Sequence, residues 1–442
     1  MGIRTSQLTE NTTLNALDLL YGVDVSDLTH SPDGTSKKIK LSTLISFLET
    51  NIDSLDIGSF DATAIVTEAE GIRDNDNDTT LPTSGAVVDA IDKGILYGMN
   101  RQAIINGNFE VWQRALSVTY TTDIANTYLA DRWSLYIGKD GGTLPTVVES
   151  RQPMTAGELD GSFFYHRLNT NGAGSSLGLI SQCNLQQPIE HGTKKLCGLN
   201  KKVTVSFYAR SSILGKKLGV CLQQRYGTGG SPSATETING AFWTLTSDWT
   251  KYSFTFTTNT LTGKTFGTED DDVLSLMFYM MWGSSVASRV GDTVAESFVG
   301  SGNVDITQVQ VTAGEDVLPF CVKSFREELR DCQRYYIKWA NATGYSPHVG
   351  IGQVFSATQA RCFIGLPTTM RKAPTLETSG EIRIFCGGGN QRIVSVFGNP
   401  SGGVYMPSTK IDVTFATSAT DGGAVGLFCS ASGSYLALNA EL

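Results

Sequence analysis

The sequence predicts a mainly β protein built from several domains. Its 442 residues include 47 glycines but only 12 prolines, and 40% of them are hydrophobic. Val203, Val205 and Phe207 alternate with polar residues, the pattern of a strand with one buried face. A chain of this length is long enough for roughly three domains. We therefore expect β-sandwiches with glycine-rich turns, joined by short helical segments.

The composition excludes several classes of partner. The formal net charge is −9 and the sequence pI is about 5.1, which argues against nucleic acid or an anionic membrane surface. No apolar run approaches the ~20 residues that a membrane-spanning helix needs, so we expect no membrane insertion. The first residues lack an apolar signal core, and we expect no cleaved leader. The eight cysteines form no Cys-x-x-Cys pair and are expected to be buried free thiols.

Residues 1–55 are predicted to form a small α+β module. Four apolar residues between 41 and 48 follow the i, i+3, i+4, i+7 spacing of a short amphipathic helix. Residues 17–25 form a strand-like apolar run, and a Ser-Pro-Asp-Gly turn follows at 31–34. Such a module would fold separately from the rest of the chain.

Residues 56–100 are predicted to be a linker and a helical neck. Ser84 is the expected N-cap, because the proline two residues before it cannot continue a helix backwards. Val88, Ile91 and Ile95 then follow a 3–4 spacing, enough for one or two turns of a bundle seam. Two interpretations remain open: the neck of a trimer, or a lone helix that lies on the next domain.

Residues 101–322 carry dense strand signals and are predicted to form a β-sandwich. Residues 273–282 are almost all apolar, which fits a strand buried on both faces. In residues 304–311 the alternation slips by one position near Thr307 and Gln308. A β-bulge there would account for the slip.

Residues 323–442 are predicted to be one helix followed by a smaller β-sandwich. Ser324 and Glu327 have the spacing of a capping box. One apolar face of the expected helix, which would dock on a neighbouring chain or domain, comprises Phe325, Leu329, Cys332, Tyr336 and Trp339. Short strands between glycine-rich turns follow to the end of the sequence.

Three segments resemble sequences that recur in bacteriophage tail fibres and receptor-binding proteins: residues 106–114, 130–133 and 326–336. The resemblance implies that residues 101–322 are a jelly roll like that of carbohydrate-binding modules, and that 323–442 form a distal β domain. Residues 1–55 are similar to modules that anchor such fibres to the tail. Within the three segments we expect structural roles for Asn106, Phe109, Trp112, Arg114, Asp131, Arg132, Trp133, Cys332, Arg334 and Tyr335.

The resemblance implies a function in attachment rather than catalysis. It predicts a homotrimer in the virion tail, assembled in the host cytoplasm, that binds a host-surface glycan or outer-membrane receptor through several weak sites. Residues 1–55 would contact tail, baseplate or adaptor proteins. Two alternatives remain: a tail-borne polysaccharide depolymerase, and a purely structural baseplate or collar protein.

Exposed aromatic side chains are the natural partners of sugar rings. Trp243 and Trp249 flank a loop-like stretch, although core packing is the favoured role for both. Further candidates lie near the glycine-rich turns of the distal domain: Tyr345, His348, Phe397 and Tyr405.

Metal and catalytic signals are weak. Asp270, Asp271 and Asp272 are expected to form a solvated loop; the alternative is a structural calcium, which carbohydrate-binding jelly rolls often hold. No other cofactor and no catalytic residue is expected. Asp131 and Glu110 are expected to form ion pairs with Arg132 or Arg114 rather than to act as a catalytic carboxylate pair.

Overall fold

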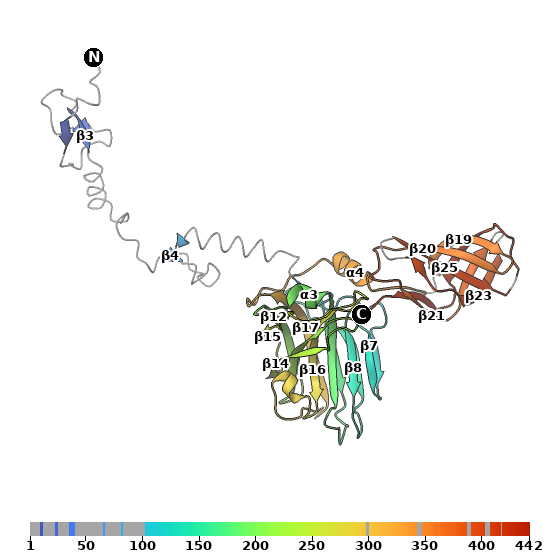
Figure 1. Cartoon of the computed structure of the whole chain (residues 1–442), viewed down its shortest axis with the longest axis horizontal. Coiled ribbons are helices and arrows are strands. Elements are labelled where there is room, and N and C mark those ends of the chain that lie inside the picture. The colour runs from blue at the N-terminus through green and yellow to red at the C-terminus, as the bar shows by residue number, and fades with distance from the viewer. Residues whose placement is uncertain are drawn as a thin grey trace, which may run out of the picture. The chain divides into compact units, whose positions relative to one another are not determined.

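The chain divides into two compact units, Met1–Gly98 and Met99–Leu442 (Figure 1). The computed structural model describes residues 9–11, 23–24, 35–39, 65–66, 81–82, 102–297, 300–342, 347–386, 390–402, 407–416 and 418–442. The helices expected near residues 41–48 and 84–95 lie outside this set. Within the described residues, no helix has the length and apolar character needed to cross a bilayer.

The first unit contains short paired strands. β1 (Thr9–Asn11) pairs in parallel with β3 (Thr35–Ile39), and β2 (Val23–Asp24) pairs with β3 in the antiparallel sense. β2 falls within the strand expected at 17–25. A second parallel pair joins β4 (Ile65–Val66) to β5 (Leu81–Pro82).

The second unit begins with a sandwich of two six-stranded antiparallel sheets. Sheet I has the order β15-β12-β17-β10-β9-β6, and sheet II has the order β14-β13-β16-β11-β8-β7. The strands of sheet I are β6 (Ser117–Tyr120), β9 (Val147–Pro153), β10 (Phe164–Thr170), β12 (Lys202–Ser211), β15 (Thr250–Thr257) and β17 (Gly302–Ala313). Those of sheet II are β7 (Ile124–Tyr128), β8 (Ser134–Gly138), β11 (Gln182–Glu190), β13 (Lys217–Arg225), β14 (Glu236–Thr244) and β16 (Val273–Trp282). The predicted mainly β, multidomain fold is confirmed.

Apolar side chains from both sheets form the core between them. Leu185, Leu276 and Phe278 of sheet II belong to the same buried cluster as Phe207 and Val309 of sheet I. The ring centroids of Phe207 and Phe278 lie 4.8 Å apart in an edge-on arrangement. Because side chains alternate along a strand, the neighbouring residues of β11 and β16 face outward from sheet II.

Both strand details expected from the sequence are present. Every residue of β16 is buried. In β17, the pairing with β12 shifts between the partners of Ser206 and Tyr208, and Gln308 has a φ of 49°. This is the expected β-bulge, with one extra residue on β17.

A short 3₁₀ segment covers one end of the outer face of sheet II. η4 (Ala287–Val290) and Val286 pack on Cys221, Met277 and Tyr279. This cover explains how β16 is buried on both faces, because its inner residues face the core and some of its outer residues face η4. The rest of the outer face carries polar residues. Helix α3 (Gly192–Leu196) follows β11.

The capped helix begins as expected but is shorter than its apolar pattern suggests. α4 (Phe325–Gln333) has both hydrogen bonds of the capping box between Ser324 and Glu327. The prediction that it continues through Tyr336 and Trp339 is wrong. Those residues lie in β18 (Tyr336–Ala340), which pairs with β27 (Tyr435–Asn439). Strand pairing with a segment about a hundred positions away outweighs the local helical spacing.

The remaining strands form a small barrel. The pairings run β20-β19-β26-β22-β23-β25, and β25 also pairs with β20, so the ring closes. The bounds are β19 (His348–Ser356), β20 (Gln359–Gly365), β22 (Ile382–Cys386), β23 (Asn390–Phe397), β24 (Ser401–Gly402), β25 (Ser408–Phe415) and β26 (Ala424–Cys429). β21 (Thr375–Ser379) joins β18 and β27 in a three-stranded sheet. The two layers expected of a smaller sandwich are thus the opposite walls of one closed sheet.

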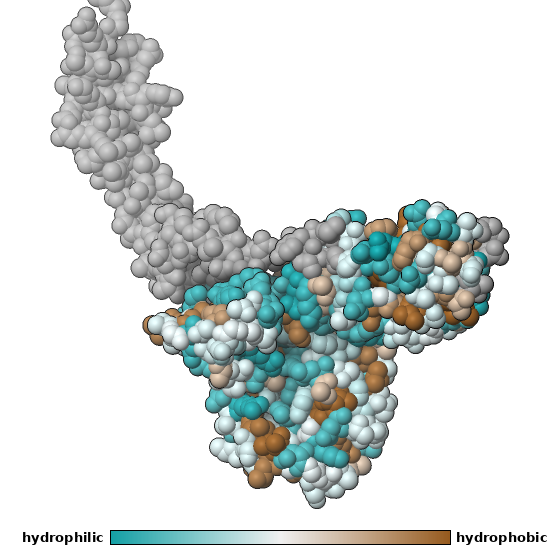
Figure 2. Space-filling model, turned by 45° about the vertical axis from the view of Figure 1, so that its right-hand side comes forward, coloured by the Kyte–Doolittle hydropathy of each residue, from teal (hydrophilic) through white to brown (hydrophobic). Residues whose placement is uncertain are grey.

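Hydrophobic residues are also found on the outside of this barrel. Ile351, Phe363 and Phe385 are 74%, 51% and 41% exposed. Ile351 lies directly opposite Phe363 and Gly426 in the strand register. Figure 2 shows brown, hydrophobic areas on the visible surface of this part of the chain.

Candidate functional site

The three segments that resemble tail-fibre sequences meet in one buried joint. The Asn106 side chain donates to the carbonyls of Val111 (2.8 Å) and Asp131 (3.0 Å) and accepts from the Val111 N–H (3.0 Å). Asn106 also has a φ of 59°, a left-handed conformation that asparagine tolerates better than most residues. This side chain therefore ties the first segment to the second.

Ion pairs and stacked rings connect these segments to α4 and to the last residues of the chain. Arg114 lies 3.1 Å from Asp131, and Arg132 pairs with Glu441. The guanidinium of Arg132 stacks on the Tyr335 ring, 3.5 Å from its centroid. The expected pairing of Asp131 with an arginine is confirmed. We use the name joint for this cluster, which comprises Asn106, Arg114, Asp131, Arg132, Tyr335 and Glu441.

The other residues expected to be structural are also largely buried. Phe109, Trp133 and Cys332 are 0% exposed, and Trp112 is 8% exposed. Trp133 donates its indole N–H to the Asn106 carbonyl at 3.0 Å. Arg334 forms a 2.8 Å ion pair with Glu190 of the sandwich. These positions suit packing rather than contact with a ligand.

Burial also perturbs the titration of the joint. Desolvation raises the pKa of Asp131 to about 7, and Arg114 and the hydrogen bonds from Gln113 oppose this only in part. Burial likewise raises the pKa of the Cys332 thiol. All eight cysteines are free, and seven of them are buried.

The two tryptophans proposed as ligand contacts belong to aromatic clusters. Trp243 packs edge-on against Phe207, with ring centroids 5.6 Å apart, next to the main core. Trp249 lies 5.2 Å from the Tyr165 ring, and the Arg210 guanidinium sits over it at 4.4 Å. The favoured packing role agrees with these contacts, and ligand binding by either residue stays a prediction.

Of the four distal candidates, two lie within the described residues, and there they occupy different strands. His348 begins β19, is exposed, and stacks on Phe428 at 5.4 Å. Phe397 ends β23 and packs against the barrel core. Tyr345 and Tyr405 lie outside the described residues. Binding by these four residues also stays a prediction.

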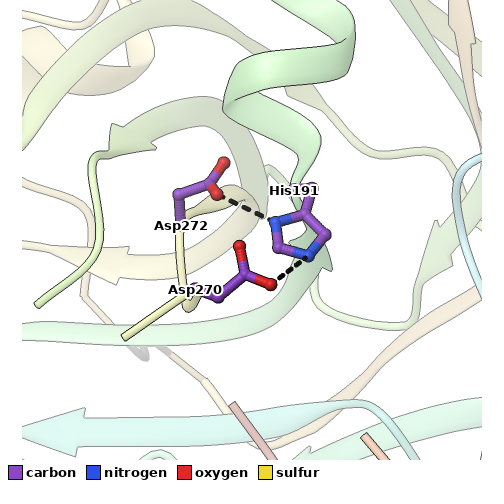
Figure 3. A group of neighbouring side chains, drawn as sticks. All are labelled: His191, Asp270 and Asp272. Atoms are coloured by element: carbon purple, nitrogen blue, oxygen red, sulfur yellow. Dashed lines mark hydrogen bonds and ion pairs between the residues drawn. The ribbon is translucent and has the colours of Figure 1, made fainter. Parts of the chain in front are cut away.

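The three aspartates expected to form a solvated loop or a calcium site contact different partners: two of them contact His191, and the third contacts Thr228. Asp270 and Asp272 each approach one nitrogen of the His191 ring (Figure 3). His191 Nδ1 is 2.9 Å from Asp272, and Nε2 is 3.7 Å from Asp270. Asp271 instead accepts hydrogen bonds from the backbone N–H and hydroxyl of Thr228, both at 2.7 Å.

The resulting donor set does not fit calcium. Calcium takes six to eight oxygen ligands, whereas the third group of this cluster is an imidazole. The Lys194 ammonium lies 2.9 Å from Asp272 and 3.6 Å from Asp270, so one cation already contacts both carboxylates. We interpret the cluster as an ion-pair network at the start of α3.

A polar cleft opens on the outer face of sheet II, next to the part of that face that η4 covers. Its volume is about 300 Å³. Gln186 and Pro188 of β11, together with Val273 and Ser275 of β16, form its floor. Strand register puts them on one face, since Pro188 lies opposite Ser275. We call this hollow the sheet II cleft.

Two floor residues hold buried polar atoms without a partner. Gln186 is 4% exposed and Ser275 is 1% exposed. Within the described chain, neither Gln186 Oε1 nor Ser275 Oγ has a hydrogen-bond partner. A buried polar group left unsatisfied costs about 1–3 kcal/mol, and such groups in native structures need an explanation. Both residues line the cleft, so a polar ligand that turned these two side chains toward it would supply the missing partners.

Residues in the walls of the cleft orient the Gln186 side chain in its floor and contribute further polar groups. Gln186 donates its amide N–H to Asn126 of β7 at 2.6 Å, which orients Oε1. Tyr128 donates its hydroxyl to the Leu442 carbonyl at 3.1 Å. The other walls include Arg225 at the end of β13 and, from the segment before β21, Arg371 and Lys372.

None of the residues chosen from the sequence as ligand contacts lines this cleft. One signal could have indicated it. Gln182, Asn184 and Gln186 occupy alternate positions of β11, so a buried strand carries a polar stripe on one face. Asn184 Oδ1 is also buried without a partner among the described residues.

Comparison with known proteins identifies no family for the chain. No protein-family model and no curated protein matches it. Solved structures are matched at low similarity. A Bacteroides thetaiotaomicron protein proposed to bind sugar has 11% identity and a TM-score of 0.28; the match covers 48% of this chain and 100% of that one.

Two further structures match a similar share of this chain. The enzymatically active domain of tailspike protein 4 from bacteriophage CBA120 has 10% identity and a TM-score of 0.25, covering 48% of this chain and 21% of that one. The CBM22-1 xylan-binding domain from Paenibacillus barcinonensis has 12% identity and a TM-score of 0.25, covering 45% of this chain and 95% of that one. At these scores the matches carry no argument about function.

Proposed function

We propose that this chain is a bacteriophage tail-fibre protein that attaches the virion to a glycan on the host surface without cleaving it. One observation carries the glycan-binding part of the proposal. The sheet II cleft holds the buried, unpartnered oxygens of Gln186 and Ser275. Sugars offer many hydroxyl groups that both donate and accept, so they can satisfy several such atoms at once.

The dimensions and setting of the cleft suit a small saccharide. Its volume of about 300 Å³ is at the lower end of the range of ligand pockets. The floor belongs to paired strands, so its polar atoms are held in place before a ligand arrives. A preformed site of this size would bind weakly, and several copies on one virion would raise the overall affinity.

The lining of the cleft favours binding over hydrolysis. Glycoside hydrolysis ordinarily needs a pair of carboxyl groups. The only side-chain carboxylate among the lining residues is Asp271, whose two oxygens already accept hydrogen bonds from Thr228. This supports adhesion over the depolymerase alternative.

The virion part of the proposal rests on the resemblance of the three segments in the joint. A trimeric fibre would carry three clefts, and residues 1–55 would attach it to tail, baseplate or adaptor proteins. Light scattering of the purified full-length chain tests the trimer: a mass near three chains is expected, and a monomer would contradict it. Phage assembled with a chain lacking residues 1–55 should lose the fibre, and retention of the fibre would contradict the anchor.

The binding test uses glycans from the host surface immobilised on a sensor. The full-length protein should bind them and should compete with phage for adsorption. Gln186→Ala should weaken binding, whereas Gln152→Ala on sheet I should leave it unchanged. An unaltered affinity of the Gln186→Ala variant would overturn the assignment to the cleft.

Two other outcomes separate the alternatives. Release of reducing ends from host polysaccharide during incubation would favour the depolymerase. Failure to bind cells, glycans or receptor preparations of any susceptible host would favour a purely structural virion protein.

A further inference from the structure

Three cationic side chains meet at the sheet II cleft. Arg225 comes from β13, whereas Arg371 and Lys372 come from the segment between β20 and β21. Within the described parts of the chain, none of the three forms an ion pair with a side-chain carboxylate. The lining of the cleft therefore sets three cationic side chains against one side-chain carboxylate, that of Asp271.

A neighbouring cavity differs from the cleft in the number of carboxylates that line it. It has a volume of about 820 Å³ and shares Arg371 and Lys372 with the cleft, but carboxylates are plentiful there. Glu190 pairs with Arg334 at 2.8 Å, and Asp270 lies 3.7 Å from His191. Two of the four carboxylates that line that cavity thus contact basic side chains other than Arg371 and Lys372.

The two guanidinium groups are held in place by neutral acceptors. Arg225 donates from Nε and Nη2 to Gln223 Oε1, at 3.3 and 3.0 Å. Arg371 donates to the backbone carbonyls of Ala440 (3.2 Å) and Glu441 (3.4 Å). Each arginine keeps further N–H groups for another acceptor. An oriented guanidinium suits planar or tetrahedral anions, which it can bind through two hydrogen bonds.

Desolvation of the three cations agrees with this picture. Burial lowers the pKa of Arg225, of Arg371 and of Lys372. Nearby carboxylates oppose the effect only in part: Glu190 and, more weakly, Asp271 act on Arg371, and Asp271 and Glu441 act on Lys372. A bound anion would relieve the same desolvation penalty.

We infer that the sheet II cleft takes an acidic sugar, whose carboxylate, sulfate or phosphate group lies against Arg225, Arg371 and Lys372. The hydroxyl groups of the same sugar would bond to Gln186 Oε1 and Ser275 Oγ. This inference rests on the proposed function and sharpens it from glycans in general to anionic ones. The geometry does not separate the three anionic groups, so the experiment compares them.

The test measures affinity for matched pairs of oligosaccharides by calorimetry. Tri-galacturonic acid is compared with its methyl ester, and sulfated and phosphorylated galactose oligomers are compared with the unmodified oligomer. We expect at least one acidic member to bind about tenfold or more tightly than its neutral partner, as charge-assisted hydrogen bonds allow. That preference should shrink as salt is raised.

Variants that each remove one positive charge test whether the preference for acidic sugars arises at the cleft. Arg225→Gln and Lys372→Gln should each reduce the acidic-to-neutral affinity ratio while leaving the affinity for the neutral partner nearly unchanged. Lys201→Gln, an exposed lysine away from the cleft, is the matched control and should change neither. An unchanged thermal midpoint for each variant shows that it is folded.

The outcomes separate the inference from the proposed function. Equal affinity for every acidic and neutral partner, with Gln186→Ala still reducing it, overturns the acidic preference and leaves glycan binding intact. An acidic preference that survives both charge-removing variants overturns its assignment to this cleft. If neither acidic nor neutral glycans bind and cells are not bound either, both proposals fail together.

Discussion

The joint and the sheet II cleft use the same residue types in opposite ways. At the joint, Arg132 is 1% exposed and pairs with Glu441, while Arg114 lies 3.1 Å from Asp131. At the cleft, Arg225 and Arg371 bond only to neutral oxygens among the described residues. The paired, buried arginine of the joint stabilises the fold, whereas the arginines of the cleft keep N–H groups that we propose to bind a ligand.

The largest expected effect on stability comes from removing the charge of an arginine in the joint. The same change at an arginine of the cleft serves as the comparison. Arg132→Met leaves the buried Glu441 with Arg114, 3.3 Å away, and also removes a hydrogen bond to the Pro188 carbonyl. It should lower the free energy of unfolding by about 3 kcal/mol, the low end of the range for breaking a buried ion pair. Arg225→Met should change it little, because no carboxylate loses a partner. Urea unfolding of both variants measures the difference. Equal losses would mean that the two regions do not differ in kind.

A second prediction concerns the pH dependence of the joint. The pKa of Asp131 is raised from the ordinary ~3.9 of an unfolded chain to about 7. Its contribution to stability is therefore fully present below about pH 4 and is lost as pH rises through about 7. Asp131→Asn should remove this component, so that urea midpoints fall less between pH 4.5 and 7.5 than in the wild type.

A carboxylate on the barrel provides the control for that experiment. Hydrogen bonding to Arg361 lowers the pKa of Asp412, so the sign reverses, and its contribution is lost as pH falls through its folded-state pKa. Asp412→Asn should therefore lower stability at neutral pH, have little effect in acid, and remove a pH dependence that lies below about pH 4. If the two variants shift the midpoints over the same pH range, the assignment to Asp131 is wrong.

A smaller change in stability is expected when the buried serine in the floor of the cleft is replaced. Ser275→Ala removes a buried hydroxyl that lacks a partner within the described structure, and should raise the free energy of unfolding by up to about 1 kcal/mol. The same change should weaken glycan binding severalfold. Calorimetry and urea unfolding on one sample would show both shifts.

Thr193 supplies a matched buried hydroxyl that is already satisfied. Its Oγ1 donates to the Val273 carbonyl at 2.8 Å. Thr193→Val should therefore destabilise the protein by about 1 kcal/mol. If Ser275→Ala destabilises as much, the floor of the cleft is ordinary core.

The smallest expected effect is that of calcium. Because His191 and Lys194 already contact Asp270 and Asp272, millimolar calcium or its removal by a chelator should leave the thermal midpoint unchanged. A rise of several degrees on adding calcium would show that these charges rearrange around an ion and are not a closed network.

Sequence patterns predicted the secondary structure best where the spacing of side chains along one element is enough to identify it. The alternation around Val205, the two-sided burial of β16 and the bulge near Gln308 all follow from local spacing. The end of α4 did not, because β18 is fixed by pairing with β27. Pairing between distant segments leaves no signal in local spacing.

The cleft was harder to predict than the fold for a related reason. Its cations come from positions 225, 371 and 372, and only the folded chain brings them together. Exposed aromatic residues were the search criterion, whereas the structure places its unsatisfied chemistry on Gln186 and Ser275. Polar residues inside a buried strand are the more useful signal here.

The return of the chain to the sandwich also limits how the barrel can move. On the way out, Arg334 and Tyr335 bond to Glu190; on the way back, Glu441 pairs with Arg132. The two attachments adjoin each other, because the Arg132 guanidinium also stacks on the Tyr335 ring, and hydrogen bonds from Gln113 and Lys338 cross the same seam. A swing of the barrel against the sandwich would have to break all of these contacts together, so the seam acts as a clamp and not as a hinge.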